Sequence, residues 1–182
     1  SDETLAAWAQ ILSAVPESRL LLKSAAFSSE EGCAAAFERL QAAGIEPARV
    51  ELRLDTREYL HEYHDVDIAL DPFPYTGGIT TCEALSMGVP VVTLAGASHG
   101  ARFGASLLTN AHLPELVAQT PPDYVRIAAG LAAAPDTLRA LRRNLRTMLR
   151  HAPLTDAAGY VHDVEDVYRS IWAKFMRAAG TA

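Results

Sequence analysis

The sequence is poor in cysteine, in basic charge and in long apolar runs, and each shortage excludes a class of protein. Its 182 residues include two cysteines, Cys33 and Cys82, which lie too far apart for a metal-type pair and suggest a reduced, cytoplasmic setting. A total of 16 Lys and Arg against 22 Asp and Glu gives a net charge of −6, so we expect no nucleic-acid partner. No run approaches the roughly 20 apolar residues of a membrane helix, and no signal peptide opens the sequence, so we expect no membrane association.

What is present is sufficient for one folded domain. The apolar fraction is 49% and the charged fraction 21%, which is typical of a globular protein. A chain of this length can bury a substantial core. We therefore expect residues 1–182 to form a single domain. Because a helical pattern begins directly after Ser1, we expect that domain to be a piece of a longer protein.

Short apolar runs alternate with helical patterns along most of the sequence. The apolar runs predict strands at 19–23, 50–54, 68–70 and 89–95. The helical patterns predict helices at 5–12, 28–44, 56–63, 79–87 and 101–109, and throughout the region beyond Pro121. Strands that alternate with helices imply a parallel sheet with right-handed crossovers. The predicted fold is α/β, a Rossmann-like parallel sheet flanked by helices with a helical C-terminal tail.

Three local details accompany this prediction. Leu20, Leu21 and Leu22 are a continuous apolar run, which predicts a strand buried on both faces. Ser28 and Glu31 have the spacing of a capping box, so we expect Ser28 to begin the second helix. Five of the 14 arginines fall within 139–150, where we interpret them as solvated surface of one helix.

The most informative segment, 67–96, places a glycine turn and a short helix between two predicted buried strands. Gly77 and Gly78 lead into Ile79, Thr80 and Thr81 at the start of that helix. The first N–H groups of a helix have no intrahelical partner, and the helix dipole favours an anion beside them. With threonine hydroxyls next to these amides, the segment predicts an anion site, most simply for a diphosphate.

Two residues extend this hypothesis to a nucleotide. Glu83 follows Thr80 by three residues in the same helix, where its carboxylate can accept both vicinal hydroxyls of a ribose. Tyr59 lies just beyond a predicted strand end, where its ring can stack on a base. Parallel sheets bind ligands beyond the carboxyl ends of their strands, where all these residues fall. The alternative is a tight turn with an N-capping threonine, since the segment matches neither G-x-G-x-x-G nor a Walker loop.

Two further motifs have competing interpretations. Residues 96–100, GASHG, fit the G-x-S-x-G pattern of a nucleophile elbow, with Ser98 as nucleophile and His162 as a later histidine. Hydrolase triads take their acid and histidine from loops after further strands, whereas only helical patterns follow here, so a serine hydrolase is the weaker alternative. His61 and His64 do not match the H-E-x-x-H of zinc proteases, and no third ligand stands out. We therefore predict no metal.

The motif DIALDPFPYTGGITTCEALSMGVPVVTLAG (67–96), followed by HGARFGASLLTNAHLPELVA (99–118), resembles the O-linked N-acetylglucosamine transferase and SPINDLY family. In that family, tetratricopeptide (TPR) repeats precede a two-domain glycosyltransferase of the GT-B type. The resemblance spans about 8–175 and implies that this chain is the carboxyl-terminal, donor-binding half, the GT-B C-terminal domain. It implies inverting, metal-free transfer from a nucleotide sugar to Ser or Thr hydroxyls of a protein acceptor. The first catalytic half and the repeats would precede this chain, so we expect the fragment alone to be inactive.

The resemblance also implies site residues. The donor-binding set that it implies is Gly77, Gly78, Ile79, Thr80, Thr81, Glu83, Arg57, Tyr59, His99 and Arg102. The helix start would hold the donor diphosphate, Glu83 the ribose, and Arg57 with Tyr59 the base. His99 and Arg102 belong to an H-x-x-R stretch, which makes Ser98 incidental.

Departures from the family pattern leave two questions open. Animal-type members carry histidine at the position of Gly78, often threonine at Ile79, lysine at Thr56 and arginine at Glu62. These departures support an alternative in which the domain binds a nucleotide sugar, or serves as a scaffold, without catalysis. The TTCEAL form is closer to the SPINDLY-like branch, which includes fucosyltransferases with a guanosine donor. UDP-N-acetylglucosamine is therefore favoured, with GDP-fucose as the alternative donor.

Overall fold

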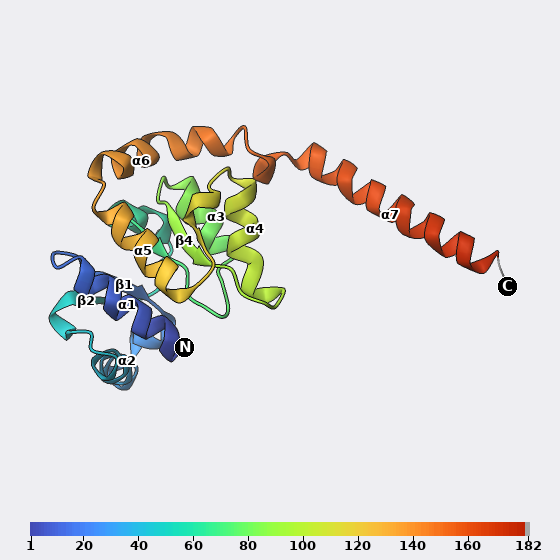
Figure 1. Ribbon diagram of the computed structural model, residues 1–182. Helices are drawn as coiled ribbons and strands as arrows, with labels where there is room; N and C mark the ends of the chain where they lie inside the picture. The colour runs from blue at the N-terminus through green and yellow to red at the C-terminus, as the bar shows by residue number, and fades with distance from the viewer. Residues whose placement is uncertain (181–182) are drawn as a thin grey trace.

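The protein, a computed structural model that describes residues 1–180, consists of parallel strands enclosed by helices (Figure 1). Its strands are β1 (Leu20–Lys23), β2 (Val50–Arg53), β3 (Ala69–Leu70), β4 (Val91–Leu94) and β5 (Val117–Ala118). Its α-helices are α1 (Asp2–Ala14), α2 (Glu30–Ala42), α3 (Ile79–Ser86), α4 (Phe103–Asn110), α5 (Pro121–Ala132), α6 (Pro135–Leu149) and α7 (Ala157–Ala179). Short 3-10 helices include η3 (Tyr59–Asp65) and η4 (Gly100–Arg102). The predicted α/β fold with a helical tail is confirmed.

The strands form two separate parallel sheets rather than the single sheet that was expected. One contains β1 and β2, with Leu20 beside Val50. The other has the order β3-β4-β5, with Ala69 beside Val91 and Thr93 beside Val117. Each parallel pair requires a crossover, and α2, α3 and α4 supply the three crossovers. The strand β5 was not predicted, because two residues are too few for a periodic pattern.

Two apolar clusters match the two sheets, and α1 joins them. The larger cluster surrounds β4 and includes Leu85, Val92, Leu108, Tyr124 and Leu145. The smaller cluster consists of Leu12, Leu20, Leu40, Ile45 and Val50. Trp8 of α1 packs against both clusters, and its indole N–H donates to the Tyr124 hydroxyl at 3.3 Å.

Several element boundaries differ from the sequence predictions. Ser29, not Ser28, caps α2 by accepting from the Gly32 N–H, because Ser28 ends a preceding 3-10 helix. The helix expected over 56–63 is the 3-10 helix η3, which begins only at Tyr59. In β1 only Leu20 is fully buried, while Leu21 and Leu22 are half-buried, because this edge of the sheet faces a cavity.

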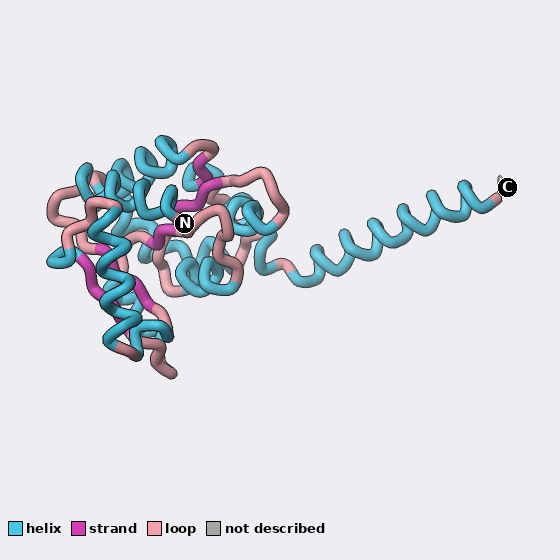
Figure 2. Tube along the Cα trace, turned by 90° about the horizontal axis from the view of Figure 1, so that it is seen from below, coloured by secondary structure: helices cyan, strands magenta, loops and turns pink. Residues whose placement is uncertain are grey.

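The last helix stands apart from the rest of the molecule. Figures 1 and 2 both show α7 extending away from the domain, and none of its residues is buried. It exposes aromatic side chains such as Tyr168 and Trp172 along one side. Among residues 1–180, no helix is both long and apolar enough to span a bilayer.

One arginine of α6 is not the solvated side chain that the sequence suggested. Arg142 Nη1 donates to the Val66 carbonyl at 2.8 Å, and its Nη2 donates to the Tyr63 carbonyl at 2.7 Å. Arg142 is half-buried, whereas its neighbour Arg143 is exposed. Arg142 thereby fixes the segment between η3 and β3 against α6.

We expect Arg142→Ala to lower the free energy of unfolding by about 2 kcal/mol, because two carbonyls lose a charged donor. Arg143→Ala is the matched control and should change it by less than about 0.5 kcal/mol. Urea denaturation monitored by circular dichroism measures both. Equal effects of the two substitutions would show that the Arg142 hydrogen bonds do not stabilise the fold.

Candidate functional site

The predicted anion site lies where α3 begins, beyond the carboxyl end of β3. Gly78 is the N-cap residue, and no side chain caps the helix. The first intrahelical bond runs from the Cys82 N–H to the Gly78 carbonyl at 3.2 Å. The three preceding amides, those of Ile79, Thr80 and Thr81, therefore have no intrahelical acceptor, as is general for the first turn of a helix. These N–H groups and the positive end of the helix dipole can bind an anion.

Two threonine hydroxyls converge beside this helix start. A Cβ atom added to Gly77 would lie 2.7 Å from Thr81 Oγ1 and 2.9 Å from Thr80 Oγ1. A Cβ added to Gly78 would meet nothing within 4 Å, so that side of the turn is open. The Ile79 side chain is 78% exposed and does not fill the site. The first turn of α3 thus presents amides and hydroxyls together around an open glycine turn.

Asp71 fixes the glycine turn in place, a role that we did not predict. Its carboxylate is only 4% exposed, and Oδ1 accepts from the Gly77 N–H at 2.6 Å. Oδ2 accepts from the Thr93 hydroxyl of β4 at 2.7 Å. Burial raises the pKa of Asp71, while the hydrogen bonds from Thr93 and Gly77 act to lower it. The signal available in the sequence was an aspartate directly after a buried strand.

Thr76 connects the same turn to the start of α4. Its hydroxyl donates to the Gly100 carbonyl at 3.2 Å and accepts from the Gly104 N–H at 3.2 Å. The predicted residues His99 and Arg102 belong to this second segment, and both are exposed. The His99 ring lies edge-on to Phe103, with centroids 5.0 Å apart. The structure therefore brings the segment of His99 and Arg102 beside the glycine turn.

The predicted base and ribose residues are in direct contact. The Tyr59 hydroxyl of η3 donates to Glu83 Oε1 of α3 at 2.5 Å, and this bond raises the Tyr59 pKa. Nearby, the Tyr63 hydroxyl donates to the Thr80 carbonyl at 3.4 Å. Arg57 is exposed on the turn before η3, and among residues 1–180 it forms no hydrogen bond or ion pair with Glu83. Of the two predicted base contacts, only Tyr59 thus lies against Glu83, the predicted ribose-binding residue.

Lys23 is a second residue that sequence reasoning missed. Its Nζ lies 2.5 Å from Glu62 Oε1 and 3.2 Å from Thr56 Oγ1, at 5.8 Å from the Tyr59 ring centroid. The hydrogen bond from Lys23, followed by that from Thr56, lowers the Glu62 pKa. Lys23 precedes Thr56 by 33 residues, so no local pattern links them. Lys23 therefore places a positive charge beside residues 56–62, where neither Thr56 nor Glu62 supplies one.

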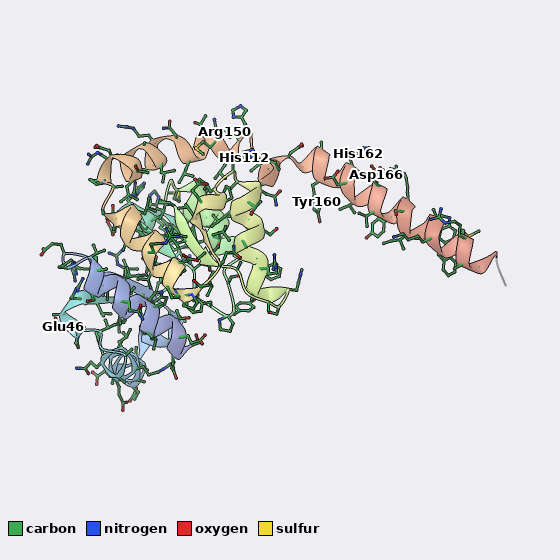
Figure 3. The ribbon with its side chains drawn as sticks, in the orientation of Figure 1. Glu46, His112, Arg150, Tyr160, His162 and Asp166 are labelled. Atoms are coloured by element: carbon green, nitrogen blue, oxygen red, sulfur yellow. The ribbon has the colours of Figure 1, made fainter. Side chains whose placement is uncertain are left out.

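The structure does not bring Ser98 and His162 together, as a serine hydrolase site would require. Ser98 is exposed, and within residues 1–180 no hydrogen bond joins it to a histidine or a carboxylate. His162 lies on the projecting helix α7, 3.6 Å from Asp166 (Figure 3). The structure therefore gives the hydrolase alternative no support.

The two histidines of η3 also lack the surroundings of a metal centre. The rings of His61 and His64 lie 5.9 Å apart and are tilted relative to each other. No group of three or more His, Cys, Asp or Glu in the described part of the chain is placed to hold a metal ion.

We expect Asp71→Ala to lower the free energy of unfolding by about 3 kcal/mol, because it leaves the Gly77 N–H and the Thr93 hydroxyl without their acceptor. Asp67→Ala is the control, since Asp67 lies at the opposite end of β3 and is exposed. Thermal and urea unfolding of both variants test this expectation. If the two variants are equally stable, Asp71 does not hold the glycine turn.

Comparison with known proteins agrees with this arrangement. The model of glycosyl transferase family 41 matches residues 1–164. A "probable UDP-N-acetylglucosamine--peptide N-acetylglucosaminyltransferase SPINDLY" of Petunia hybrida is 41% identical over 182 residues, which cover 96% of this chain and 19% of that protein. The Caenorhabditis elegans UDP-N-acetylglucosamine--peptide N-acetylglucosaminyltransferase is 31% identical over 175 residues, 94% of this chain and 15% of that protein.

A solved structure gives the same result. It is that of a mutant O-GlcNAc transferase of Thermobaculum terrenum, which is 40% identical with a TM-score of 0.88. The match covers 97% of this chain and 34% of that one, so the present chain corresponds to part of its relatives. A family match over most of the sequence, together with this structural likeness, shows that the chain belongs to glycosyl transferase family 41.

Proposed function

We propose that this chain is the donor-binding half of a protein O-glycosyltransferase and holds the diphosphate of a nucleotide sugar at the start of α3. The observation that carries the proposal is the set of uncapped first-turn amides with the Thr80 and Thr81 hydroxyls around Gly77. Membership of glycosyl transferase family 41 supports a sugar donor as the source of that diphosphate. The named relatives support a protein acceptor.

In this proposal the domain stabilises the leaving group. The acceptor hydroxyl oxygen bonds to the anomeric carbon, the bond from that carbon to the diphosphate oxygen breaks, and the nucleotide diphosphate departs with inversion. Negative charge grows on the diphosphate, where the amides of α3 and the hydroxyls of Thr80 and Thr81 are already oriented. Preorganised donors of this kind contribute about 3 kcal/mol each to lowering a barrier. The base that removes the acceptor proton lies outside the residues of this site.

Glu83 and Tyr59 extend the proposal to the nucleoside. The Glu83 carboxylate binds the ribose hydroxyls, and Tyr59 stacks on the base from η3. Because the Tyr59 hydroxyl occupies Glu83 Oε1 at 2.5 Å, binding exchanges this hydrogen bond for one from the ribose. UDP-N-acetylglucosamine is the favoured donor, because it is in the names of the relatives, and GDP-fucose is the alternative.

The complete enzyme requires more than this chain. The chain spans about a fifth of the length of the curated relatives that it matches, as the 19% coverage shows. A preceding catalytic half would supply acceptor-side groups, and TPR repeats would bind the protein acceptor. The domain alone would bind the donor without turning it over.

The decisive experiment is calorimetric titration of UDP and GDP into the full-length protein and into its Gly77→Ala and Gly130→Ala variants. We expect Gly77→Ala to weaken nucleotide binding at least about tenfold, because the new methyl group displaces the two threonine hydroxyls. Gly130 of α5 lies outside the donor-binding set, and a Cβ added there meets nothing within 4 Å, so Gly130→Ala should bind within about twofold of the wild type.

If neither nucleotide binds at millimolar concentration, the proposed function is wrong. Nucleotide binding without sugar transfer by the full-length protein would instead favour the scaffold alternative. Equal binding by the two glycine variants would place the diphosphate elsewhere.

A second prediction concerns the ribose acid. Glu83→Ala should weaken nucleotide binding by about 1.5 kcal/mol, or roughly tenfold, because a charged hydrogen-bond acceptor is lost. Its melting temperature should stay close to that of the wild type. Glu58→Ala is the matched control, since Glu58 is exposed beside Tyr59 and caps no helix through its side chain. A large loss of stability on Glu83→Ala, with unchanged affinity, would make Glu83 a structural residue.

A further inference from the structure

Helix α6 concentrates positive charge on an acidic protein. The segment 135–150 contains five arginines and one aspartate, a net charge of +4, whereas the whole chain has a net charge of −6. Figure 1 shows α6 along the outer edge of the domain. Positive charge gathered on one surface attracts partners of the opposite sign.

Four of these arginines form a stripe along one side of the helix. Arg139, Arg143, Arg146 and Arg150 are separated by four, three and four positions, which places them on one helix face, and all four are exposed. We call these four residues the arginine stripe. The fifth arginine, Arg142, instead donates to backbone carbonyls before β3.

The apolar side of α6 fixes the direction in which the stripe points. Leu145 is fully buried, and Leu138 and Leu141 pack against the larger cluster around β4. These leucines lie on the side of the helix opposite the stripe. The stripe is therefore held toward solvent by the packing of the core.

Three arginines of the stripe have no partner of their own. Among residues 1–180, Arg143, Arg146 and Arg150 form no hydrogen bond or ion pair. By contrast, Arg126 of α5 and Arg169 of α7 are each paired with a carboxylate of the same helix. Guanidinium groups bind carboxylates through two parallel hydrogen bonds, so three neighbouring free ones are suited to an anionic ligand.

A hollow of about 440 Å³ lies at the carboxyl end of the stripe. It is lined by Ser86, Arg146, Leu149, Arg150 and Thr155. The Ser86 and Thr155 hydroxyls both donate to backbone carbonyls of this chain, so the two guanidinium groups supply the free donors among the lining residues. The hollow is beside the last turn of α3, whereas the proposed diphosphate site is at its first turn. It is therefore a separate place for an acidic side chain.

The dimensions of the stripe suit a short extended peptide. The α-helical rise separates successive arginines of the stripe by about 6, 4.5 and 6 Å along the axis. In an extended peptide, side chains on one face repeat about every 6.6 Å. Acidic residues at alternate positions of such a peptide therefore come opposite successive arginines.

Two other anionic partners fit this face less well. In α6, all of which the structure describes, no large apolar side chain is exposed, so this face has nothing to insert into a bilayer. Outside 135–150 the chain has a net charge of −10, the difference between −6 and +4. That charge repels a long polyanion such as a nucleic acid, whereas a short acidic segment contacts the stripe alone.

We propose that the arginine stripe of α6 is a docking surface for an acidic segment of a partner protein, bound in extended form with aspartate or glutamate at alternate positions. Arg143, Arg146 and Arg150 pair with successive carboxylates, and one acidic side chain enters the hollow. Recognition of acidic motifs by clusters of arginines is a recurring mode of peptide binding. The surface holds a partner without using any residue of the proposed donor site.

Fluorescence anisotropy of a labelled synthetic peptide tests this proposal on the full-length protein. The probe has about eight residues, with glutamate alternating with serine, which is long enough to span the stripe. A second peptide has glutamine in place of every glutamate. We expect the glutamine peptide to bind at least about tenfold more weakly, because it lacks the charge.

Two triple variants locate the binding surface. The stripe variant is Arg143→Gln, Arg146→Gln and Arg150→Gln, and it should bind the glutamate peptide at least about tenfold more weakly than the wild type. The matched control is Arg39→Gln, Arg126→Gln and Arg169→Gln, which removes the same charge from exposed arginines of other helices. The control should bind within about threefold of the wild type, because only long-range attraction changes. Circular dichroism melting curves report whether both variants are folded.

Four results would overturn the proposal. The wild type does not bind the glutamate peptide, or it binds the glutamine peptide equally well. The two triple variants weaken binding equally, which would assign the effect to net charge. Vesicles of anionic phospholipid, or duplex DNA, bind the stripe more tightly than the peptide does, which would give the surface another class of partner. Neither triple variant should change nucleotide affinity, so failure of this proposal is distinguishable from failure of the proposed function.

Discussion

The buried carboxylate of Asp71 is the interaction on which the arrangement of the site depends. Asp71 directly follows β3. Its carboxylate accepts from the Gly77 amide and from the Thr93 hydroxyl of β4, and its backbone carbonyl accepts from the Tyr124 hydroxyl at 3.0 Å. A buried charge is tolerated only when its oxygens are hydrogen-bonded, so these donors and the carboxylate define one another's positions. Removing the carboxylate would release the glycine turn from the sheet, and the first turn of α3 would lose its fixed position.

This anchoring fixes the start of the eight-residue helix α3, as its proposed binding role requires. Its N-terminal amides are left unpaired because Gly78 carries no side chain to cap them, and Asp71 and Thr76 hold the preceding turn from both sides. In the proposed function, the site would therefore not need to order itself around a diphosphate, and electrostatic stabilisation requires such preorganisation. The hydrogen bond between Tyr59 and Glu83 holds together the two residues that are proposed to bind the nucleoside.

The two sheets are held together chiefly by one helix. The smaller cluster around Leu40 is joined to the larger one mainly through α1, because Trp8 packs against both.

The sequence by itself determined the alternation of strands and helices, the glycine–threonine turn and Glu83, because periodicity and spacing are local properties of the chain. It also determined the family, through the unbroken motif of 67–96. It could not determine that Ser29 rather than Ser28 caps α2, since a preceding 3-10 helix takes Ser28. Only the tertiary structure decided that Lys23 lies beside Glu62, that Arg142 binds the carbonyls before β3, and that Asp71 carries the glycine turn. Lys23 and Glu62, Arg142 and Tyr63, and Asp71 and Thr93 are distant in sequence, and these contacts form only when the elements that carry them pack together.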